Sequence, residues 1–183
     1  ISEYANIIRQ AVKSKVNTRK FSSMGRLFDA VSAVLSVCGY NSYEGECAIL
    51  LENSAYYAMK NRIEPYPLKF NLKEEPDTVC INQIKILGNI YDAYKNGAGK
   101  EAIALGFHIA VAEMVAEVCD IIRHQCGEQR VALSGGVFAN RVLLEECVRR
   151  LEGCGFEVLF NNIVPPNDGG ISLGQAWIGS MLL

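Results

Sequence analysis

The feature that most constrains the fold is a change in the spacing of apolar residues in the second half of the chain. Residues 130–134 have the pattern of a short buried strand, with Val131, Ala132 and Leu133 at its centre, and Gly135 and Gly136 follow at once. Helical spacing then begins, with apolar residues at Leu144, Cys147, Val148 and Leu151. Residues 157–160 fit a second strand. A strand, a glycine turn, a helix and a strand make a βαβ unit, which places the chain in the α/β class.

The rest of the chain is predicted to be mostly helical. The clearest helix covers residues 24–35, where apolar side chains recur at helical spacing for about three turns. A short strand is predicted at residues 66–72, within an irregular stretch that contains prolines. The remaining predicted helices cover residues 3–14, 43–60, 81–94, 101–124 and 171–181.

Charge and composition exclude several classes of function. The chain of 183 residues has a net charge of −2, which offers no positive surface to nucleic acid or to an anionic membrane. No apolar run approaches the roughly 20 residues of a membrane span, and no leader-like segment is found. We therefore expect a cytoplasmic protein without a nucleic-acid or membrane partner. Because the chain starts at Ile1 and enters helical sequence almost at once, we expect a fragment of a longer protein.

The seven cysteines are expected to be reduced thiols of a cytosolic protein. No two of them form a Cys-x-x-Cys pair, and with only His108 and His124 available no zinc site is predicted. Most lie among apolar neighbours, where a thiol packs as a small hydrophobic group. None lies on a sharp turn with a histidine nearby in sequence, so no cysteine nucleophile is predicted. His108 borders the apolar stripe of its helix and is predicted to be structural.

The glycine turn is the first candidate for chemistry. Gly135 and Gly136 let the backbone turn sharply and let a ligand approach the main chain. The following helix is expected to offer unpaired N–H groups and a partial positive charge to an anion. Asn140, about one turn into that helix, carries an amide that can donate to and accept from the edge of a heterocycle. The alternative is a tight turn that binds nothing.

Asp168 is the second candidate. A carboxylate followed by Gly169 and Gly170 can expose an oxygen to a metal ion, since hard cations and iron both accept carboxylate ligands. Aspartate is also a favoured N-cap, so Asp168 can instead cap the last predicted helix. One aspartate is not a metal site, and the sequence has no partner ligands at an obvious spacing.

Two polar segments in the first third of the chain are further candidates. Gly25 and Asp29 share the helix face opposite the apolar stripe, together with Ser32 and Ser36. A ligand can contact the backbone of Gly25 there and donate hydroxyl groups to Asp29, or the face can simply be solvated. Residues 43–46 form either an acidic first helical turn or a second wall of a nucleotide pocket.

Taken together, four segments resemble the signature segments of one family. They are residues 22–31 (SSMGRLFDAV), 43–46 (YEGE), 133–141 (LSGGVFANR) and 165–176 (PPNDGGISLGQA). In this order they are similar to the HypF family, the carbamoyltransferases that begin cyanide-ligand synthesis for nickel–iron hydrogenases. The resemblance extends over the whole chain, and the last two segments are long and specific.

The resemblance implies a two-lobed, actin-like ATPase fold (ASKHA, ribonuclease H-like), shared with the tRNA threonylcarbamoyl transferases. Residues 1–183 look like its helix-rich C-terminal lobe. In that superfamily, residues matching Asp29 and Gly45 contact the ribose side of a nucleotide. The turn matching Gly135 and Gly136 approaches its phosphate, and the residue matching Asn140 contacts adenine.

The residue matching Asp168 is a metal ligand in the superfamily, and a His-x-x-x-His pair on the first lobe completes the site. His108 and His124 do not have that spacing, so this chain lacks the pair. The resemblance therefore implies a divalent metal (iron, zinc or magnesium) that the missing lobe helps to bind.

The implied function is carbamoyl transfer. Carbamoyl-adenylate is made from carbamoyl phosphate and ATP in a separate domain. The domain containing this lobe then passes the carbamoyl group to the C-terminal cysteine thiolate of a partner, HypE, and no catalytic residue is predicted in the lobe itself. Three alternatives remain open: an O-carbamoyltransferase acting on a small hydroxylated molecule, a threonylcarbamoyl transferase, and a noncatalytic protein-docking lobe.

Overall fold

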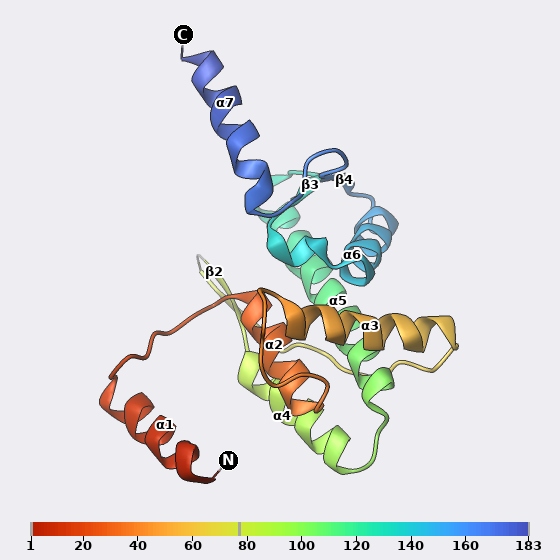
Figure 1. The fold of residues 1–183 in the computed structure, drawn as a ribbon. Helices are drawn as coiled ribbons and strands as arrows, with labels where there is room; N and C mark the ends of the chain where they lie inside the picture. The colour runs from red at the N-terminus through yellow and green to blue at the C-terminus, as the bar shows by residue number, and fades with distance from the viewer. Residues whose placement is uncertain (1, 77, 183) are drawn as a thin grey trace.

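One long helix, α5 (Lys100–Cys126), lies at the centre of the computed structural model, which describes residues 2–76 and 78–182. Around it pack α2 (Met24–Val34), α3 (Glu46–Lys60), α4 (Gln83–Lys95) and α6 (Arg141–Gly153) (Figure 1). By length and composition α5 is apolar enough to cross a membrane, but 56% of its most apolar window is buried inside the molecule. Its apolar character is therefore that of a core helix.

The predicted apolar stripe of α2 is confirmed. Leu27, Phe28 and Val31 are buried, and the Phe28 ring meets the Phe107 ring of α5 edge-on with centroids 4.9 Å apart. The opposite face of α2 was predicted to meet a ligand or solvent, but Ser32 on that face is fully buried. Its hydroxyl has no hydrogen-bond partner among the described residues. The burial of α2 therefore extends beyond one stripe.

The predicted βαβ unit is confirmed. Strand β3 (Arg130–Leu133) pairs in parallel with β4 (Glu157–Phe160), with Arg130 opposite Glu157 and Leu133 opposite Phe160. The 3-10 helix η1 (Gly136–Ala139) joins β3 to α6, and α6 packs on β4. The unit thus sets the glycine turn at the carboxyl end of β3, beside the start of α6.

A β-hairpin was not predicted. Strands β1 (Leu72–Glu75) and β2 (Thr78–Ile81) pair antiparallel, with Leu72 opposite Ile81. The strand predicted at residues 66–72 is wrong, because this segment runs irregularly along α5 until it reaches β1. There the N–H of Tyr66 donates to the carbonyl of Ala102 at 2.9 Å. A Cβ at Gly106 would lie 2.0 Å from the carbonyl oxygen of Tyr66, so only glycine fits at that crossing.

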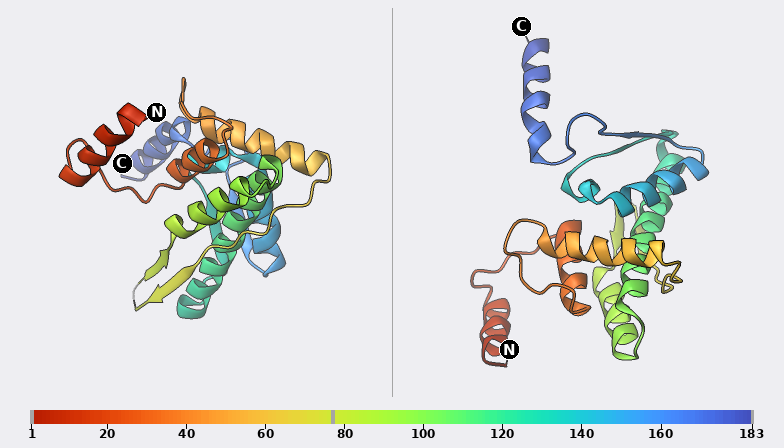
Figure 2. Two further views of the ribbon diagram at one scale, coloured as in Figure 1. Left: turned by 90° about the horizontal axis from the view of Figure 1, so that it is seen from below. Right: turned by 45° about the vertical axis from the view of Figure 1, so that its right-hand side comes forward.

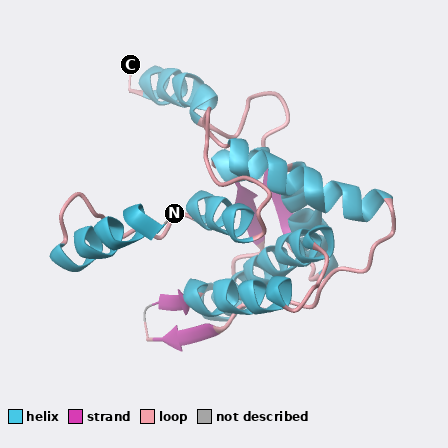
Figure 3. Cartoon of the chain, turned by 60° about the horizontal axis from the view of Figure 1, so that its bottom comes forward, coloured by secondary structure: helices cyan, strands magenta, loops and turns pink. Residues whose placement is uncertain are grey.

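Two helices project from the body. They are α1 (Ser2–Ser14) and α7 (Ile171–Met181), and the 3-10 helix η2 (Asp168–Gly170) precedes α7. Both extend away from the body in Figure 1 and in the right-hand view of Figure 2. Figure 3 shows the same separation, with the β3–β4 pair lying among the central helices. Both projecting helices expose large apolar side chains, at Tyr4, Ile7, Ile8, Val12, Leu173, Trp177, Ile178 and Met181.

Candidate functional site

The glycine turn and the Asp168 loop, which lie far apart in the sequence, meet in the structure. The N–H of Gly135 donates to the carbonyl of Pro166 at 2.9 Å. A Cβ at Gly136 would lie 3.9 Å from the Cβ of Asn167, so the loop passes directly beside the turn. Gly135 has φ +99°, in the left-handed region that favours glycine. The backbone conformation thus accounts for Gly135, and Asn167 of the Asp168 loop lies beside Gly136.

Two backbone N–H groups at this turn are available to a ligand. The 3-10 helix η1 begins at Gly136, and its first hydrogen bond runs from Phe138 N–H to the Gly135 carbonyl at 3.0 Å. The first N–H groups of a helix have no partner inside it. Within residues 2–76 and 78–182, no acceptor is recorded for the N–H of Gly136 or of Val137. These donors lie at the surface, where an anion can approach them.

The prediction that the N-terminus of α6 is open to an anion is wrong. A carboxylate oxygen of Glu52, on α3, accepts from the N–H of Arg141 at 2.8 Å and of Val142 at 3.4 Å. The side-chain oxygen of Asn140 accepts from the N–H of Leu143 at 2.9 Å. A negative side chain is stabilised there by the helix dipole. The protein therefore fills this N-terminus with its own carboxylate, and the sequence gives no sign of it because Glu52 is distant.

Asn140 was predicted to lie about one turn inside the helix. In the structure it is the N-cap of α6. It is only 9% exposed, and its amide nitrogen lies 2.9 Å from Nε2 of His108. His108 is fully buried, which confirms that it is structural. Burial lowers the pKa of His108 to about 4, while a hydrogen bond to the carbonyl of Ala104 opposes that effect.

Asp29 lies on α2, which borders η1. Its side chain is 23% exposed and pairs with Arg26 at 3.3 Å. Burial raises the pKa of Cys47 to about 11, and the nearby charges of Asp29 and Glu46 add to the increase. Helix α2, which carries Asp29, also packs on α3. Gly25, one turn earlier, is half-buried.

Gly45 is the N-cap of α3, with φ +80° in the left-handed region. The helix predicted from residue 43 therefore begins only at Glu46, because the glycine reverses the backbone immediately before it. The carboxylate of Glu46 accepts from the hydroxyl of Ser42 at 2.7 Å and from its N–H at 2.6 Å, which lowers the pKa of Glu46. Of Glu44 and Glu46, the two acidic residues of this segment, Glu46 thus holds the loop before α3 through its hydrogen bonds to Ser42.

Asp168 is exposed in η2, beside the glycine turn. It does not cap α7 as predicted, because the N-cap of α7 is Gly170 and no side chain accepts a cap hydrogen bond there. Asn167 caps the preceding η2 instead: its side-chain oxygen accepts from the N–H of Gly169 at 3.0 Å. In the part of the chain that the structure describes, no group of three or more His, Cys, Asp or Glu residues could hold a metal ion. A single carboxylate does not fit a divalent metal, so the implied metal needs ligands from elsewhere.

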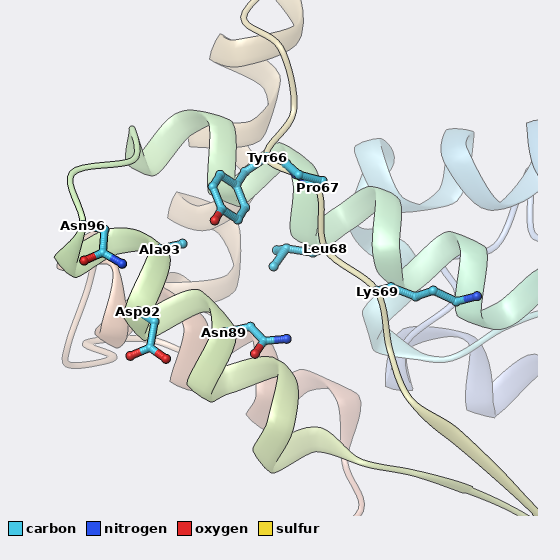
Figure 4. Close-up of a pocket in the computed structure, with 8 residues that line it drawn as sticks. All are labelled: Tyr66, Pro67, Leu68, Lys69, Asn89, Asp92, Ala93 and Asn96. Carbon is cyan, nitrogen blue, oxygen red and sulfur yellow. The ribbon is translucent and has the colours of Figure 1, made fainter.

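A separate groove lies on another part of the molecule. It has a volume of about 310 Å³ and lies between the segment before β1 and α4 (Figure 4). Tyr66 and Lys69 line it on one side and Asn89, Asp92 and Asn96 on the other. None of the predicted site residues belongs to it.

Comparisons with known proteins identify the class of this chain. A family described as "Carbamoyltransferase, Kae1-like Domain, second subdomain" matches residues 2–175. The chain is thus the second subdomain of a Kae1-like carbamoyltransferase domain. It belongs to the HypF family of carbamoyltransferases.

Curated relatives support that assignment. A probable carbamoyltransferase HypF from Methanocaldococcus jannaschii is 30% identical over 169 residues, which are 92% of this chain and 21% of the relative. The carbamoyltransferase HypF of Synechocystis is 34% identical over 155 residues, which are 84% of this chain and 19% of the relative. The chain therefore spans about a fifth of the length of these relatives.

Solved structures confirm the fold. A full-length HypF, described in its phosphate- and nucleotide-bound form, matches 100% of this chain and 23% of that protein, with a TM-score of 0.89 and 39% identity. HypF of T. kodakarensis matches 98% of this chain and 22% of that protein, with a TM-score of 0.77 and 29% identity. The predicted fold class, a helix-rich α/β lobe of the actin-like type, is confirmed.

Proposed function

We propose that this lobe helps to bind carbamoyl-adenylate between two lobes and to transfer its carbamoyl group to the C-terminal cysteine thiolate of a HypE-like partner. Membership of the HypF family supports the carbamoyl chemistry. The phosphate- and nucleotide-bound form described for the related full-length HypF supports a nucleotide ligand. The other HypF domains make the adenylate from ATP and carbamoyl phosphate and complete the site. The whole enzyme acts in the cytoplasm, where its free thiols stay reduced.

The observation that carries this proposal is the meeting of the glycine turn with the Asp168 loop. The phosphate of the adenylate binds the N–H groups of Gly136 and Val137, because Glu52 already fills the N-terminus of α6. The ribose lies towards Asp29 and Gly45. Asn140 offers the free edge of its amide to the adenine.

The chemical step is an acyl substitution. The partner thiolate attacks the carbamoyl carbon, a C–S bond forms, and the C–O bond to the phosphate breaks as AMP leaves with the electron pair. Backbone donors at the glycine turn stabilise the negative charge on the leaving phosphate. The buried cysteines of this lobe are not suited to act as the nucleophile, because burial raises the pKa of Cys47 to about 11 and of Cys147 to about 12.

The nucleotide part of the proposal is tested by Asp29→Asn in the complete protein. The variant weakens a polar contact to the ribose, and a hydrogen bond is worth about 1 kcal/mol, or roughly five-fold in affinity for an adenine nucleotide. Asp92→Asn is the matched control, because Asp92 lines the separate groove of Figure 4. Calorimetric titrations that give both variants the wild-type affinity would remove Asp29 from the site.

The acceptor is tested with a peptide that carries the C-terminal cysteine of a HypE-like protein. The complete protein, supplied with ATP and carbamoyl phosphate, is expected to add one carbamoyl group to the peptide thiol, as mass spectrometry measures. A cysteine-to-serine peptide is the control. Carbamoylation of a small hydroxylated molecule with no reaction at the peptide thiol would replace this proposal by the O-carbamoyltransferase alternative.

A further inference from the structure

Two cysteine thiols meet where the loop after α2 reaches α3. The side chains of Cys38 and Cys47 contact each other through a hydrogen bond. Cys38 is half-buried near the start of the loop, and Cys47 is buried in the first turn of α3. Both thiols are free, and the proposed function uses neither of them. Two free thiols in contact are the arrangement from which a disulfide can form.

The directions of the hydrogen bonds at this pair can be deduced. The carbonyl of Tyr40 can only accept a hydrogen, so the Cys38 thiol donates to it at 3.2 Å. The Cys38 sulfur then has only lone pairs to offer, and it accepts from the Cys47 thiol. The sulfur of Cys38 therefore faces the thiol of Cys47.

Backbone contacts hold this loop at both of its ends. The N–H groups of Val37 and Cys38 donate to the carbonyl of Ser32 at 2.9 and 3.4 Å, which fastens the start of the loop to α2. The side-chain oxygen of Asn41 accepts from the N–H of Cys47 at 2.7 Å, which fastens the loop to α3. The backbone thus holds the two thiols beside each other.

A metal ion does not account for the pair. In the described ranges, 2–76 and 78–182, no group of three or more His, Cys, Asp or Glu residues could hold a metal. Two thiols alone do not complete a site for a soft metal such as zinc. Thiol–disulfide chemistry needs only the two sulfurs, and so it fits what the structure contains.

We propose that Cys38 and Cys47 form a reversible modification site, where a low-molecular-weight disulfide such as oxidised glutathione joins the two sulfurs and thereby weakens nucleotide binding. The effect on the nucleotide rests on the proposed function, which places the ribose towards Asp29 and Gly45. In a reducing cytoplasm the pair consists of two thiols, and it responds when small disulfides accumulate.

Cys38 reacts first, because it is the more exposed of the two thiols. Its thiolate attacks one sulfur of the small disulfide, an S–S bond forms, and one small thiolate leaves with the electron pair. The Cys47 thiolate then attacks the Cys38 sulfur, and the second small thiolate leaves. The two protons of the cysteine thiols end on the two small thiols. The protein has lost two electrons, and the small disulfide has gained them.

The second step is possible although Cys47 is a poor nucleophile towards molecules in solution. Burial raises the pKa of Cys47 to about 11, and the contact with Cys38 adds to the increase. The attack on Cys38 is intramolecular, however, and well-oriented groups of one molecule reach effective concentrations of about 10⁵–10⁸ M. Cys47 therefore reacts with the sulfur that it already contacts and with no other partner.

Formation of the bond moves the loop. Bonded sulfur atoms lie closer together than two thiols in contact, and Cys38 gives up the hydrogen that it donates to Tyr40. Cys47 is buried in α3 while Cys38 is only half-buried, so the loop moves more than the helix does. Residues 39–44, which lead into Gly45, shift with Cys38. The ribose then meets a loop with a changed shape, and its contacts weaken.

The test treats the complete protein with oxidised glutathione. Mass spectrometry of peptides prepared without reductant is expected to find Cys38 joined to Cys47, and dithiothreitol should reverse the bond. Calorimetric titration with ADP should show an affinity roughly five-fold lower for the oxidised protein, which corresponds to the loss of about one hydrogen bond. Reduction should restore the original affinity.

Two variants test the roles of the two sulfurs. Cys38→Ser removes the first attacking sulfur but keeps a donor for the Tyr40 carbonyl. It should form no crosslink, and its affinity for ADP should not respond to the oxidant. Cys47→Ala lacks the second attack, so Cys38 should remain joined to glutathione as a mixed disulfide.

Cys119→Ser is the matched control. Cys119 is half-buried like Cys38, and it lies on α5 near Cys147 of α6. No hydrogen bond between Cys119 and Cys147 is recorded in the part of the chain that the structure describes. The Cys119→Ser variant should therefore form the Cys38–Cys47 crosslink and lose ADP affinity as wild type does.

The outcomes separate this inference from the proposed function. Oxidised wild type without the Cys38–Cys47 crosslink overturns the inference, and so does a Cys38→Ser variant that responds to the oxidant as wild type does. A crosslink that leaves the ADP affinity unchanged overturns it too, but leaves the nucleotide site standing. Reduced wild type that does not bind ADP defeats the proposed function, and the inference with it.

Discussion

Asp168 and Asn167 are adjacent residues beside the glycine turn, and their roles can be tested separately. Asn167 caps η2 through its side-chain oxygen, while Asp168 is exposed. If Asp168 binds a metal together with ligands of the first lobe, Asp168→Asn removes the anionic charge that a divalent cation favours. We expect this variant of the complete protein to lose bound metal and carbamoyl transfer, as elemental analysis and activity assays measure.

The melting temperature provides the matching control for Asp168. The comparison uses metal-free protein, because a bound metal would itself raise the wild-type melting temperature. Without metal, Asp168→Asn should have the melting temperature of wild type. Asn167→Ala should show the opposite pattern: removal of a cap costs about 0.5–2 kcal/mol of stability, while the metal stays. Equal metal content and activity in wild type and Asp168→Asn would mean that Asp168 is not a ligand.

His108 predicts a stability that depends on pH. Its pKa is about 4 when folded, against about 6.5 in the unfolded chain. Between pH 6.5 and pH 4 the ring binds a proton in the unfolded chain but not in the folded chain. The contribution of His108 to the free energy of unfolding is therefore fully present above pH 6.5. It decreases as the pH falls towards 4 and then levels off. The difference corresponds to about 3 kcal/mol.

Denaturant titrations from pH 7 to pH 4 measure this loss. Other groups titrate in the same range, so the useful quantity is the difference between wild type and His108→Gln, whose side chain has no charge to gain. Wild type should lose more stability on acidification than the variant does. Parallel curves for the two proteins would show that the pKa of His108 is the same in the folded and the unfolded protein.

At Asn140 the sequence supports only part of the correct description. The motif after the glycine turn correctly singled out Asn140, but the sequence placed it about one turn inside the helix, where its amide was expected to face a ligand. The structure shows a nearly buried cap bonded to His108. The partner lies on another helix, and no local pattern in the sequence records such a long-range contact.

Among the elements, α3 and α6 are joined by a contact that spans much of the chain. The carboxylate of Glu52 holds the first N–H groups of α6, close to the glycine turn. Glu52→Gln keeps the acceptor but removes the charge, and should lower stability by about 0.5–1 kcal/mol. Glu52→Ala leaves the N–H groups without their partner and should cost about 1–3 kcal/mol.

Glu145, on α6 itself, gives the control for the charge of Glu52. Its pairing with Arg141 is long, at 3.9 Å, and exposed. Such pairs contribute about 0–1 kcal/mol, so Glu145→Ala should change the unfolding free energy very little. Chemical denaturation of the three variants measures the difference. If Glu52→Ala is as harmless as Glu145→Ala, the contact does not stabilise α6.

Helical periodicity predicted α2, α3, α4 and α6 in approximately their correct places, because each buries an apolar face in the core around α5. It failed where no periodicity exists. Strand β1 contains Lys73, Glu74 and Glu75, with only its first residue half-buried, so it shows none of the alternation that marks a strand. Pairing with β2 defines that strand instead. A strand was predicted at residues 66–72 instead, although pairing with β2 begins only at Leu72.

At the scale of the whole molecule, α1 and α7 carry apolar residues that nothing in the described part covers. No residue of α7 is buried, and Trp177 and Ile178 are more than half exposed. An apolar helix of this kind is normally buried in a larger structure. We expect hydrogen exchange at α7 to be fast in the isolated chain and slow in the complete protein. Equal exchange rates in the two would mean that α7 stays uncovered.

The isolated chain is expected to fold around α5 and yet not to transfer carbamoyl groups. Its core draws on five helices, but the proposed site has only one of two walls. Circular dichroism and denaturant unfolding test the first half of this prediction, and incubation with carbamoyl-adenylate and a HypE tail peptide tests the second. Adding the missing domains in trans is the positive control. Turnover by the chain alone would show that one lobe suffices.

The crossing of residue 66 over Gly106 has a consequence for the mutational tolerance of the whole lobe. Helices usually accept alanine more readily than glycine, so a scan of α5 for helix propensity would mark position 106 as an easy improvement. Here the added methyl group would collide with the Tyr66 carbonyl and lift the irregular segment off the central helix. In a library of random variants selected for folded protein, position 106 should therefore return glycine almost alone, while exposed positions of the same helix, such as Gln125, vary freely.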